Sequence, residues 1–232
     1  MIYITGDVHR DFTFVENFCK YGNTAVSDTF IILGDVGINY RGDPYDRKLK
    51  EELTKLPITL LCIHGNHEMR PESIGSYEEC LYFNGVVYRE NAHRNLLFAK
   101  DGEIYEINNK RCLALGGAYS IDKKIRLARG WGWWADEQPS DEIKRRVERR
   151  LDTEKWNVDF VLSHTCPYKY MPREAFLPEI VQTLVNNDTE IWLDSIENKL
   201  CYSRWYCGHF HIEKDVHKIR FMYESILELE AE

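Results

Sequence analysis

Short runs of consecutive apolar residues alternate along this chain with segments whose apolar residues recur every three or four positions. The runs at residues 2–5, 30–33, 58–63, 112–115, 160–162 and 205–207 are continuous, as expected of strands buried on both faces. The second pattern predicts helices at residues 11–21, 44–56, 141–153, 174–186 and 189–199. Strands that alternate with helices are typical of an α/β fold.

Two further segments have the pattern of antiparallel pairs. Residues 95–108 place Asp101-Gly102 between two strand-like runs, which is a strong hairpin signal. Residues 219–223 and 226–229 predict a second hairpin or meander. A length of 232 residues is enough for one sizeable core. We therefore expect mixed sheets in a single domain over residues 1–232, without internal repeats.

Polar blocks directly follow five of the apolar runs. In open α/β sheets ligands bind at the carboxyl ends of strands, so these blocks are candidates for a binding site. Asp7 and His9 are two residues apart and share a face if the segment is extended, as do His209 and His211. The blocks are Gly6-Asp7-Val8-His9, Gly34-Asp35, Gly65-Asn66-His67-Glu68, Ser163-His164 and Gly208-His209-Phe210-His211.

The donor atoms in these blocks point to metal ions. They offer carboxylate, amide and imidazole groups without a thiolate, which favours Mn²⁺, Fe or Zn²⁺ over a structural cysteine-type zinc site. The number of donors fits two ions that share the carboxylate of Asp35. Two ions about 3.5–4 Å apart suit in-line displacement at phosphorus, because they bind both the attacking and the leaving oxygen.

The amino-acid composition limits the kinds of molecule that this protein is expected to bind. The net charge of −8 argues against binding of long nucleic acids, although one local basic pocket for a phosphate is compatible with it. The seven Cys residues are scattered without a C-x-x-C pair, which favours reduced thiols in the cytoplasm. No signal peptide or run of about 20 apolar residues is present, so no membrane partner is expected. The pattern leaves the oligomeric state open.

The order Asp-x-His, Gly-Asp, Gly-Asn-His-Glu, His and Gly-His-x-His over residues 6–211 resembles the calcineurin-like metallophosphoesterase superfamily, in particular its small bacterial and phage-type members. The resemblance implies a four-layer α-β-β-α sandwich, with two mixed sheets flanked by helices. It also implies two divalent metal ions, with manganese expected first and iron or zinc as alternatives. One ion would be held by Asp7, His9, Asp35 and His211, and the other by Asp35, Asn66, His164 and His209.

The same resemblance implies a mechanism. A hydroxide that bridges the two ions would attack phosphorus, and His67 would protonate the leaving oxygen or stabilise its charge. Glu68 would orient a neighbouring group such as His67. The expected substrate is a small phosphoester.

The chain departs from the protein phosphatases of this superfamily after Asp35. Val36 and Gly37 stand there, and the Arg that grips phosphate is absent from the block. Candidate substrate-binding residues are Arg10, Arg41 and Arg70, each of which has the alternative of being a solvated surface residue.

A diester carries one fewer negative charge than a monoester and needs less cationic binding. This difference favours a phosphodiester or nucleotide-type substrate. A phosphomonoesterase or protein phosphatase, a nuclease acting on short oligonucleotides and a catalytically silent binding module on the same fold are the alternatives.

Residues 117–139 form the other distinctive segment, because they hold Trp131, Trp133 and Trp134, half of the six Trp residues. One hypothesis is a cap over the metal site whose aromatic faces stack a base or a sugar. The alternative is an aromatic plug that packs a long loop onto the sheet. Among the other histidines, we expect His64 to be structural and His93 and His217 to lie on the surface.

Overall fold

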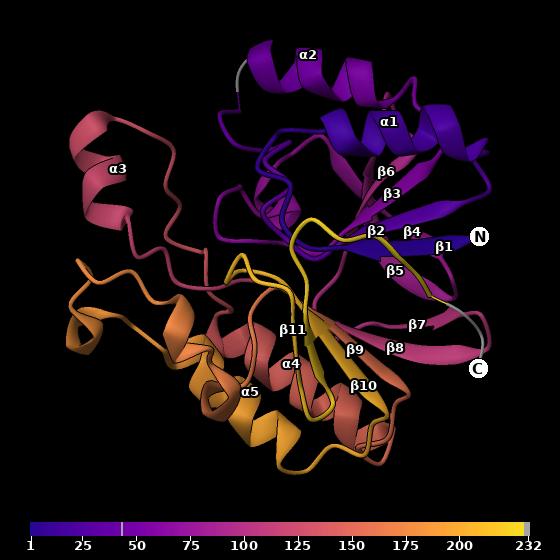
Figure 1. Cartoon of the computed structure of the whole chain (residues 1–232). Coiled ribbons are helices and arrows are strands. Elements are labelled where there is room, and N and C mark those ends of the chain that lie inside the picture. The colour runs from indigo at the N-terminus through magenta and orange to yellow at the C-terminus, as the bar shows by residue number, and fades with distance from the viewer. Residues whose placement is uncertain (43, 230–232) are drawn as a thin grey trace.

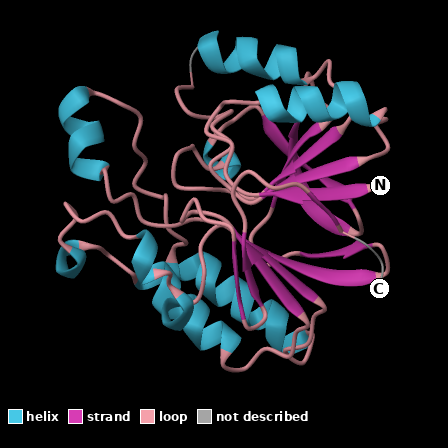
Figure 2. Cartoon of the chain, viewed as in Figure 1, coloured by secondary structure: helices cyan, strands magenta, loops and turns pink. Residues whose placement is uncertain are grey.

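The computed structural model describes residues 1–42 and 44–229. Two β-sheets lie face to face, and helices cover the outer face of each (Figures 1 and 2). This arrangement confirms the predicted α/β fold with two mixed sheets between helical layers.

The first sheet has seven strands among the described residues. Its four central strands are parallel, and three antiparallel strands complete it at the two edges. In spatial order the strands are β13 (Leu227–Glu228), β1 (Ile2–Thr5), β2 (Thr29–Ile32), β3 (Thr59–Cys62), β6 (Leu96–Ala99), β5 (Gly85–Glu90) and β4 (Tyr77–Tyr82).

The second sheet has six strands within the same described ranges. Four of them are parallel, while the first and last run antiparallel to their neighbours. In spatial order they are β11 (Lys214–Val216), β12 (Ile219–Phe221), β10 (Arg204–Cys207), β9 (Phe160–Ser163), β8 (Lys110–Leu115) and β7 (Ile104–Ile107).

The core follows from the alternation of side chains along each strand. Ile4 and Leu61 of the first sheet pack between the sheets against Ala114 and Leu162 of the second. On the outer face of the first sheet, Phe30 packs with residues of α1 (Thr13–Gly22) and α2 (Pro44–Leu53). Since both faces of a strand are buried, its apolar run is continuous.

The outer face of the second sheet is covered in the same way. Val161 and Trp205 pack with Val147 of α4 (Asp141–Thr153) and Leu193 of α5 (Asp188–Glu197). The helices predicted at residues 11–21, 44–56, 141–153 and 189–199 are therefore present. The start of α4 is fixed by Ser140, whose hydroxyl accepts a hydrogen bond from the backbone N–H of Ile143.

The helix predicted at residues 174–186 is wrong. This segment forms only short 3₁₀ turns at Arg173–Ala175 and Gln182–Leu184. Pro178 stands inside the predicted span, where its ring and its missing N–H oppose an α-helix. The segment instead runs as an extended connection from β9 to α5.

The strand pairs predicted for the two hairpins are also wrong, although the segment after His211 does contain a hairpin, formed by β11 and β12. Residues 100–103 cross from β6 in the first sheet to β7 in the second, and β12 and β13 likewise belong to different sheets. Asp101 and Gly102 do form a turn, closed by a hydrogen bond from the backbone N–H of Glu103 to the carbonyl oxygen of Lys100, but this turn joins strands of different sheets. The carboxylate of Asp101 also accepts hydrogen bonds from Arg70 and from the backbone N–H of Gly116. The antiparallel pairs of neighbouring strands are β4 with β5, β7 with β8 and β11 with β12.

One helix projects beyond the layers. It is α3 (Lys123–Arg129), which lies within residues 117–139, on the side of the molecule toward which β1 runs (Figure 1). The extended connection at residues 173–187 projects on the same side. Over residues 1–42 and 44–229, every helix is too short or too polar to cross a membrane.

Candidate metal centre

The five polar blocks meet at one edge of the two sheets. Asp7, Asp35 and Asn66 follow β1, β2 and β3, whereas His164 and His209 follow β9 and β10 of the second sheet. Because the sheets face each other, their parallel strands deliver side chains to a common pocket. The predicted convergence of the blocks is therefore observed.

The backbone at this edge has an uncommon conformation. Positive φ angles between 47° and 68° occur at His9, Asp35, His209 and His211. Non-glycine residues rarely adopt this left-handed region, which costs on the order of 1–3 kcal/mol per residue. Residues held in this way are concentrated at functional sites, because the surrounding structure has to maintain them.

Two glycines permit the strand ends to approach closely. Gly34 has a φ of +100°, and a Cβ atom there would lie 2.1 Å from His164 Nδ1. A Cβ atom on Gly208 would lie 2.1 Å from Asp7 Oδ1. No larger residue fits either position without displacing these side chains.

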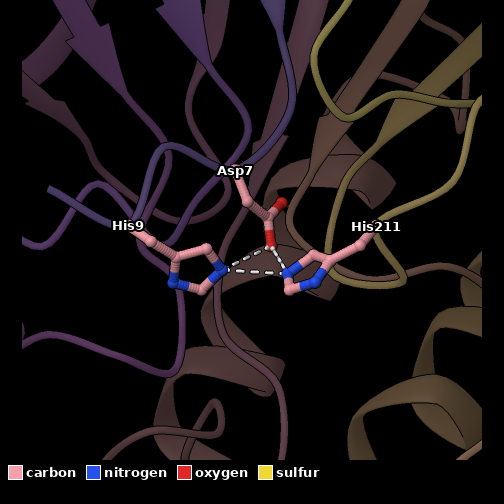
Figure 3. A group of neighbouring side chains, drawn as sticks. All are labelled: Asp7, His9 and His211. Atoms are coloured by element: carbon pink, nitrogen blue, oxygen red, sulfur yellow. Dashed lines mark hydrogen bonds and ion pairs between the residues drawn. The ribbon is translucent and has the colours of Figure 1, made fainter. Parts of the chain in front are cut away.

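Asp7, His9 and His211 form one group (Figure 3). Asp7 Oδ2 lies 3.2 Å from His211 Nε2 and 3.7 Å from His9 Nε2. The two imidazole nitrogens are themselves 2.9 Å apart. Asp7 Oδ1 accepts the backbone N–H of His209, whereas its Oδ2 is buried without a hydrogen-bond partner. A buried carboxylate oxygen facing two imidazole nitrogens fits a bound cation.

Asn66 and His164 form a second group with Asp35. His164 Nδ1 lies 2.8 Å from the carbonyl oxygen of Leu33, to which it donates, so Nε2 is the ring nitrogen turned toward Asn66 and Asp35. This nitrogen lies 2.8 Å from Asn66 Oδ1 and 3.4 Å from Asp35 Oδ1. One imidazole nitrogen and two oxygens, all of them metal-ligating atoms, therefore lie close together, which again fits a bound cation.

The amide of Asn66 is oriented by Ser120. Asn66 Nδ2 donates to Ser120 Oγ at 3.0 Å, and the buried Arg126 donates to the same oxygen at 3.1 Å. Oδ1 is therefore the amide atom that faces His164. The role of Ser120 was missed in the sequence, although it follows β8 at the edge where the other blocks lie.

Asp35 lies between the two groups. Its Oδ2 is 3.8 Å from His9 Nε2 and 3.9 Å from His67 Nε2, while its Oδ1 faces His164. Burial opposes its ionisation, but the imidazoles of His164, His67 and His9 outweigh burial and hold the pKa of Asp35 well below its usual range. The geometry fits a carboxylate shared by two sites. Groups able to hold a metal ion are Asp7–His9–His211, His9–Asp35–His67 and Asp7–Asp35–His164.

His209 and His67 complete the polar floor of the pocket. The His209 ring lies 4.9 Å from that of His164, and desolvation lowers its pKa to about 3, so it is a neutral imidazole at physiological pH. His67 is anchored by its backbone N–H, which donates to Asp35 Oδ1 at 2.9 Å. Desolvation lowers the pKa of the His67 ring as well.

Glu68 has a different role from the predicted one. Its buried carboxyl group accepts backbone N–H groups of Val36, Gly37 and Gly65 at 2.9–3.3 Å, which ties the loops after β2 and β3 together. Burial raises its pKa to about 8. His64 is buried and within 3.1 Å of the Glu68 carbonyl, as expected of a structural residue.

The two remaining histidines differ from each other. His93 is buried and contacts Thr54 Oγ1 at 2.8 Å, so its prediction as a surface residue is wrong. His217 is exposed, as predicted.

The three candidate arginines are not brought to this pocket. Arg70 is buried and pairs with Asp101 at 2.7 Å, so its guanidinium is committed elsewhere. Arg10 pairs with Asp46 at 2.6 Å, and Arg41 is exposed beside the ring of Tyr45. None of the three lines the pocket above the metal groups.

The pocket has a volume of about 490 Å³. Its floor includes His9, Asp35, Asn66, His67, His209 and His211. Its wall is largely apolar, with side chains from residues 171–187 and from the segment after β10. These lining residues all lie within the described ranges, and they include no Lys or Arg. The apolar wall residues are Ile121, Met171, Ala175, Phe176, Leu177, Val185, Phe210 and Ile212.

Fold and site together define a four-layer α/β protein whose strand ends hold donors for divalent cations. The model of the calcineurin-like phosphoesterase family matches residues 1–213, and the chain belongs to this family.

Other comparisons add little. A solved structure of a protein of unknown function from Aquifex aeolicus is similar at 14% identity, over 74% of this chain and 81% of that one, with a TM-score of 0.34. This likeness is too weak to support an inference. None of the curated proteins matches the chain.

Proposed function

We propose that this protein is a phosphodiesterase that uses two divalent metal ions. Its family supports metal-dependent hydrolysis of phosphoesters in general. The observation that carries the proposal is the opposition of His164 Nε2 and Asn66 Oδ1 at 2.8 Å, beside the unpartnered and buried Asp7 Oδ2. Buried oxygen and imidazole nitrogen atoms that converge in this way are suited to holding divalent cations.

The geometry supports a division of the donors into two sets that share Asp35. The first set is Asp7, His9, Asp35 and His211, and the second is Asp35, Asn66, His164 and His209. All donors are oxygen or imidazole nitrogen, so we propose manganese, with iron or zinc as the alternatives.

The chain's residues have distinct roles in the proposed reaction. Bound cations would neutralise phosphoryl oxygens and generate the attacking hydroxide from water. His67 lines the same pocket and is anchored to Asp35 through its backbone. Its imidazole N–H donates to the leaving oxygen, which stabilises the negative charge that develops there.

The lining of the pocket supports a diester. A phosphomonoester dianion is usually bound by guanidinium or ammonium groups, and the lining contains neither. A diester carries a single negative charge, and its second ester arm has an apolar wall beside it. Burial of that arm contributes about 25 cal/mol for each Å² of apolar surface removed from water.

The test compares bis(p-nitrophenyl) phosphate with p-nitrophenyl phosphate as substrates of the manganese-loaded chain. We expect kcat/KM to be at least about tenfold higher for the diester. Asp35→Asn should lower it by roughly a thousandfold and reduce the bound manganese from two ions per chain to one or none. Asp215→Asn is the matched control, since this exposed aspartate pairs with Arg204 and belongs to none of the metal groups.

A higher kcat/KM for the monoester would overturn the substrate class. If the chain binds two ions and hydrolyses neither ester, it is a binding module rather than a hydrolase.

A further inference from the structure

A second cavity lies beside the metal pocket and shares no lining residue with it. It has a volume of about 790 Å³ and is lined by Tyr40, Arg41 and residues 130–134. These residues come from the loop after β2 and from the segment that follows α3, the helix that projects beyond the sheets (Figure 1). A volume of this size is sufficient for a small molecule.

Aromatic rings dominate the lining. Tyr40 and Trp134 make an edge-to-face contact with ring centroids 5.7 Å apart, which holds two large rings at a steep angle. Trp131 is 49% exposed, so an unusually large apolar ring is left open to solvent. Rings that are exposed and held in place are suited to stacking on another planar ring, because little conformational entropy is lost.

Cationic side chains surround these rings. The guanidinium of Arg129 lies 4.8 Å from the ring of Trp131, and that of Arg10 lies 5.7 Å from the ring of Tyr40. Arg41 belongs to the lining itself, whose residues include no Asp or Glu. The cavity therefore favours a ligand that is both planar and anionic.

A single buried side chain connects this cavity to the metal pocket. Arg126 Nη1 contacts the backbone carbonyl of Asn66 at 3.4 Å, within the proposed metal centre. The same guanidinium lies 5.6 Å from the ring of Tyr40 and 5.9 Å from that of Trp134. Arg126 therefore contacts a residue of the metal pocket and lies beside two rings that line the second cavity.

We propose that this cavity binds the nucleobase of a short nucleotide phosphodiester whose phosphorus lies at the metal centre. The proposal rests on the proposed phosphodiesterase function, and it adds the class of substrate. Stacking on Trp131 supplies affinity for the base without strong sequence preference, because every base has a planar face. The net charge of −8 is consistent with a short substrate rather than a long polymer.

The test uses two diesters with the same leaving group. One is the p-nitrophenyl ester of thymidine 5′-phosphate, which carries a base, and the other is methyl p-nitrophenyl phosphate, which does not. In the manganese-loaded chain, Trp131→Ala should raise KM for the thymidine ester about tenfold more than KM for the methyl ester. Trp131→Phe retains a ring and should recover most of this difference.

A dinucleotide used as a competitor extends the test to both arms of the diester. Its inhibition constant against hydrolysis of the methyl ester should rise about tenfold in Trp131→Ala. The matched control is Trp156→Ala, since this Trp lies on the second sheet's helical side, where it bonds to Asp152. Its substitution should leave both the KM ratio and the inhibition constant as in the unaltered chain.

The outcomes separate the two proposals. Hydrolysis of the methyl ester together with an unchanged KM ratio and an unchanged inhibition constant in Trp131→Ala overturns the base site and leaves the phosphodiesterase function intact. If the unaltered chain hydrolyses neither diester and does not bind the dinucleotide, both proposals fail. Loss of dinucleotide binding in Trp131→Ala supports the base site irrespective of turnover.

Discussion

The floor and the wall of the metal pocket are built in different ways. Asp35 and Asn66 of the floor follow short, fully buried strands, and glycines at positions 34 and 208 allow the strand ends to lie close together. The wall comes largely from residues 171–187, an extended connection with exposed apolar side chains such as Leu177. A rigid floor suits the placement of reacting groups, whereas a loop-built wall suits variation in the substrate.

The largest loss of activity is expected when a side chain is added at Gly208, where the strand ends leave no space for one. In Gly208→Ala the new methyl group would meet Asp7 Oδ1 at 2.1 Å, so Asp7 has to move away from His9 and His211. We expect kcat/KM for bis(p-nitrophenyl) phosphate to fall by roughly a thousandfold. The free energy of unfolding, measured with urea, should fall by about 1–3 kcal/mol.

Gly75→Ala is the control for this variant, since a methyl group there meets nothing within 4 Å. Normal manganese content and activity in Gly208→Ala would show that Asp7 can shift without loss of function, which contradicts the description of the floor as rigid.

A smaller and more selective effect is expected at His67, which lies on the floor of the pocket. If its N–H stabilises the leaving oxygen, His67→Ala should lower kcat by about 100-fold with methyl phenyl phosphate. The loss should be only a few-fold with methyl p-nitrophenyl phosphate, because nitrophenolate is stable without a proton donor. The exposed His217 provides the control substitution. Equal losses with both esters would assign His67 to metal binding instead.

Ser120, which orients the side-chain amide of Asn66, should influence the affinity for metal ions. Ser120→Ala removes the acceptor that orients the Asn66 amide and leaves Arg126 with one fewer partner. The Kd for manganese, measured by titration calorimetry, should rise about 10- to 100-fold. Ser225→Ala is the control, since that hydroxyl bonds to Glu213 at the surface. An unchanged Kd would mean that Asn66 is oriented without Ser120.

The smallest effect is expected in the wall. Leu177→Lys places an ammonium group in a lining that has no cation, while the side chain is already 49% exposed. The ratio of kcat/KM for p-nitrophenyl phosphate to that for the diester should rise by about three- to fivefold, because a dianion gains more than a monoanion. Leu81→Lys, at an exposed position on β4, controls for the added charge. If the ratio stays constant, the wall does not select the substrate.

The residues of the floor could be predicted from the sequence, because continuous apolar runs are followed there directly by polar residues. Strands buried on both faces have continuous apolar runs, and the polar residues that follow them, such as Asp35 and His164, stand out from that background. The same apolar runs predicted that each sheet is covered on both faces, and hence the layered fold. Gly34 and Gly208 were conspicuous for the same reason, because each directly precedes a proposed metal-binding residue.

The errors have local physical causes. Pro178 was overlooked within an apolar segment. Asp101-Gly102 does form a turn, but this turn carries the chain from the first sheet to the second instead of closing a hairpin. The hairpin of β4 and β5 was missed, yet its signal is present as Asn84-Gly85, with Phe83 and Asn84 at φ of 48° and 61°. Long-range contacts such as that between Ser120 and Asn66 leave no periodic trace in the sequence.

The order of the donors along the chain has a consequence for biosynthesis. Asp7 enters the growing polypeptide 204 residues before His211. At a rate of about 5–20 residues per second, an incomplete site exists for roughly 10–40 s during translation. The first sheet's donors cannot acquire a full set of partners until β9 and β10 have been made and docked. Each of the two proposed donor sets includes a histidine that follows a strand of the second sheet, so either set is completed late, once the two sheets have closed on each other.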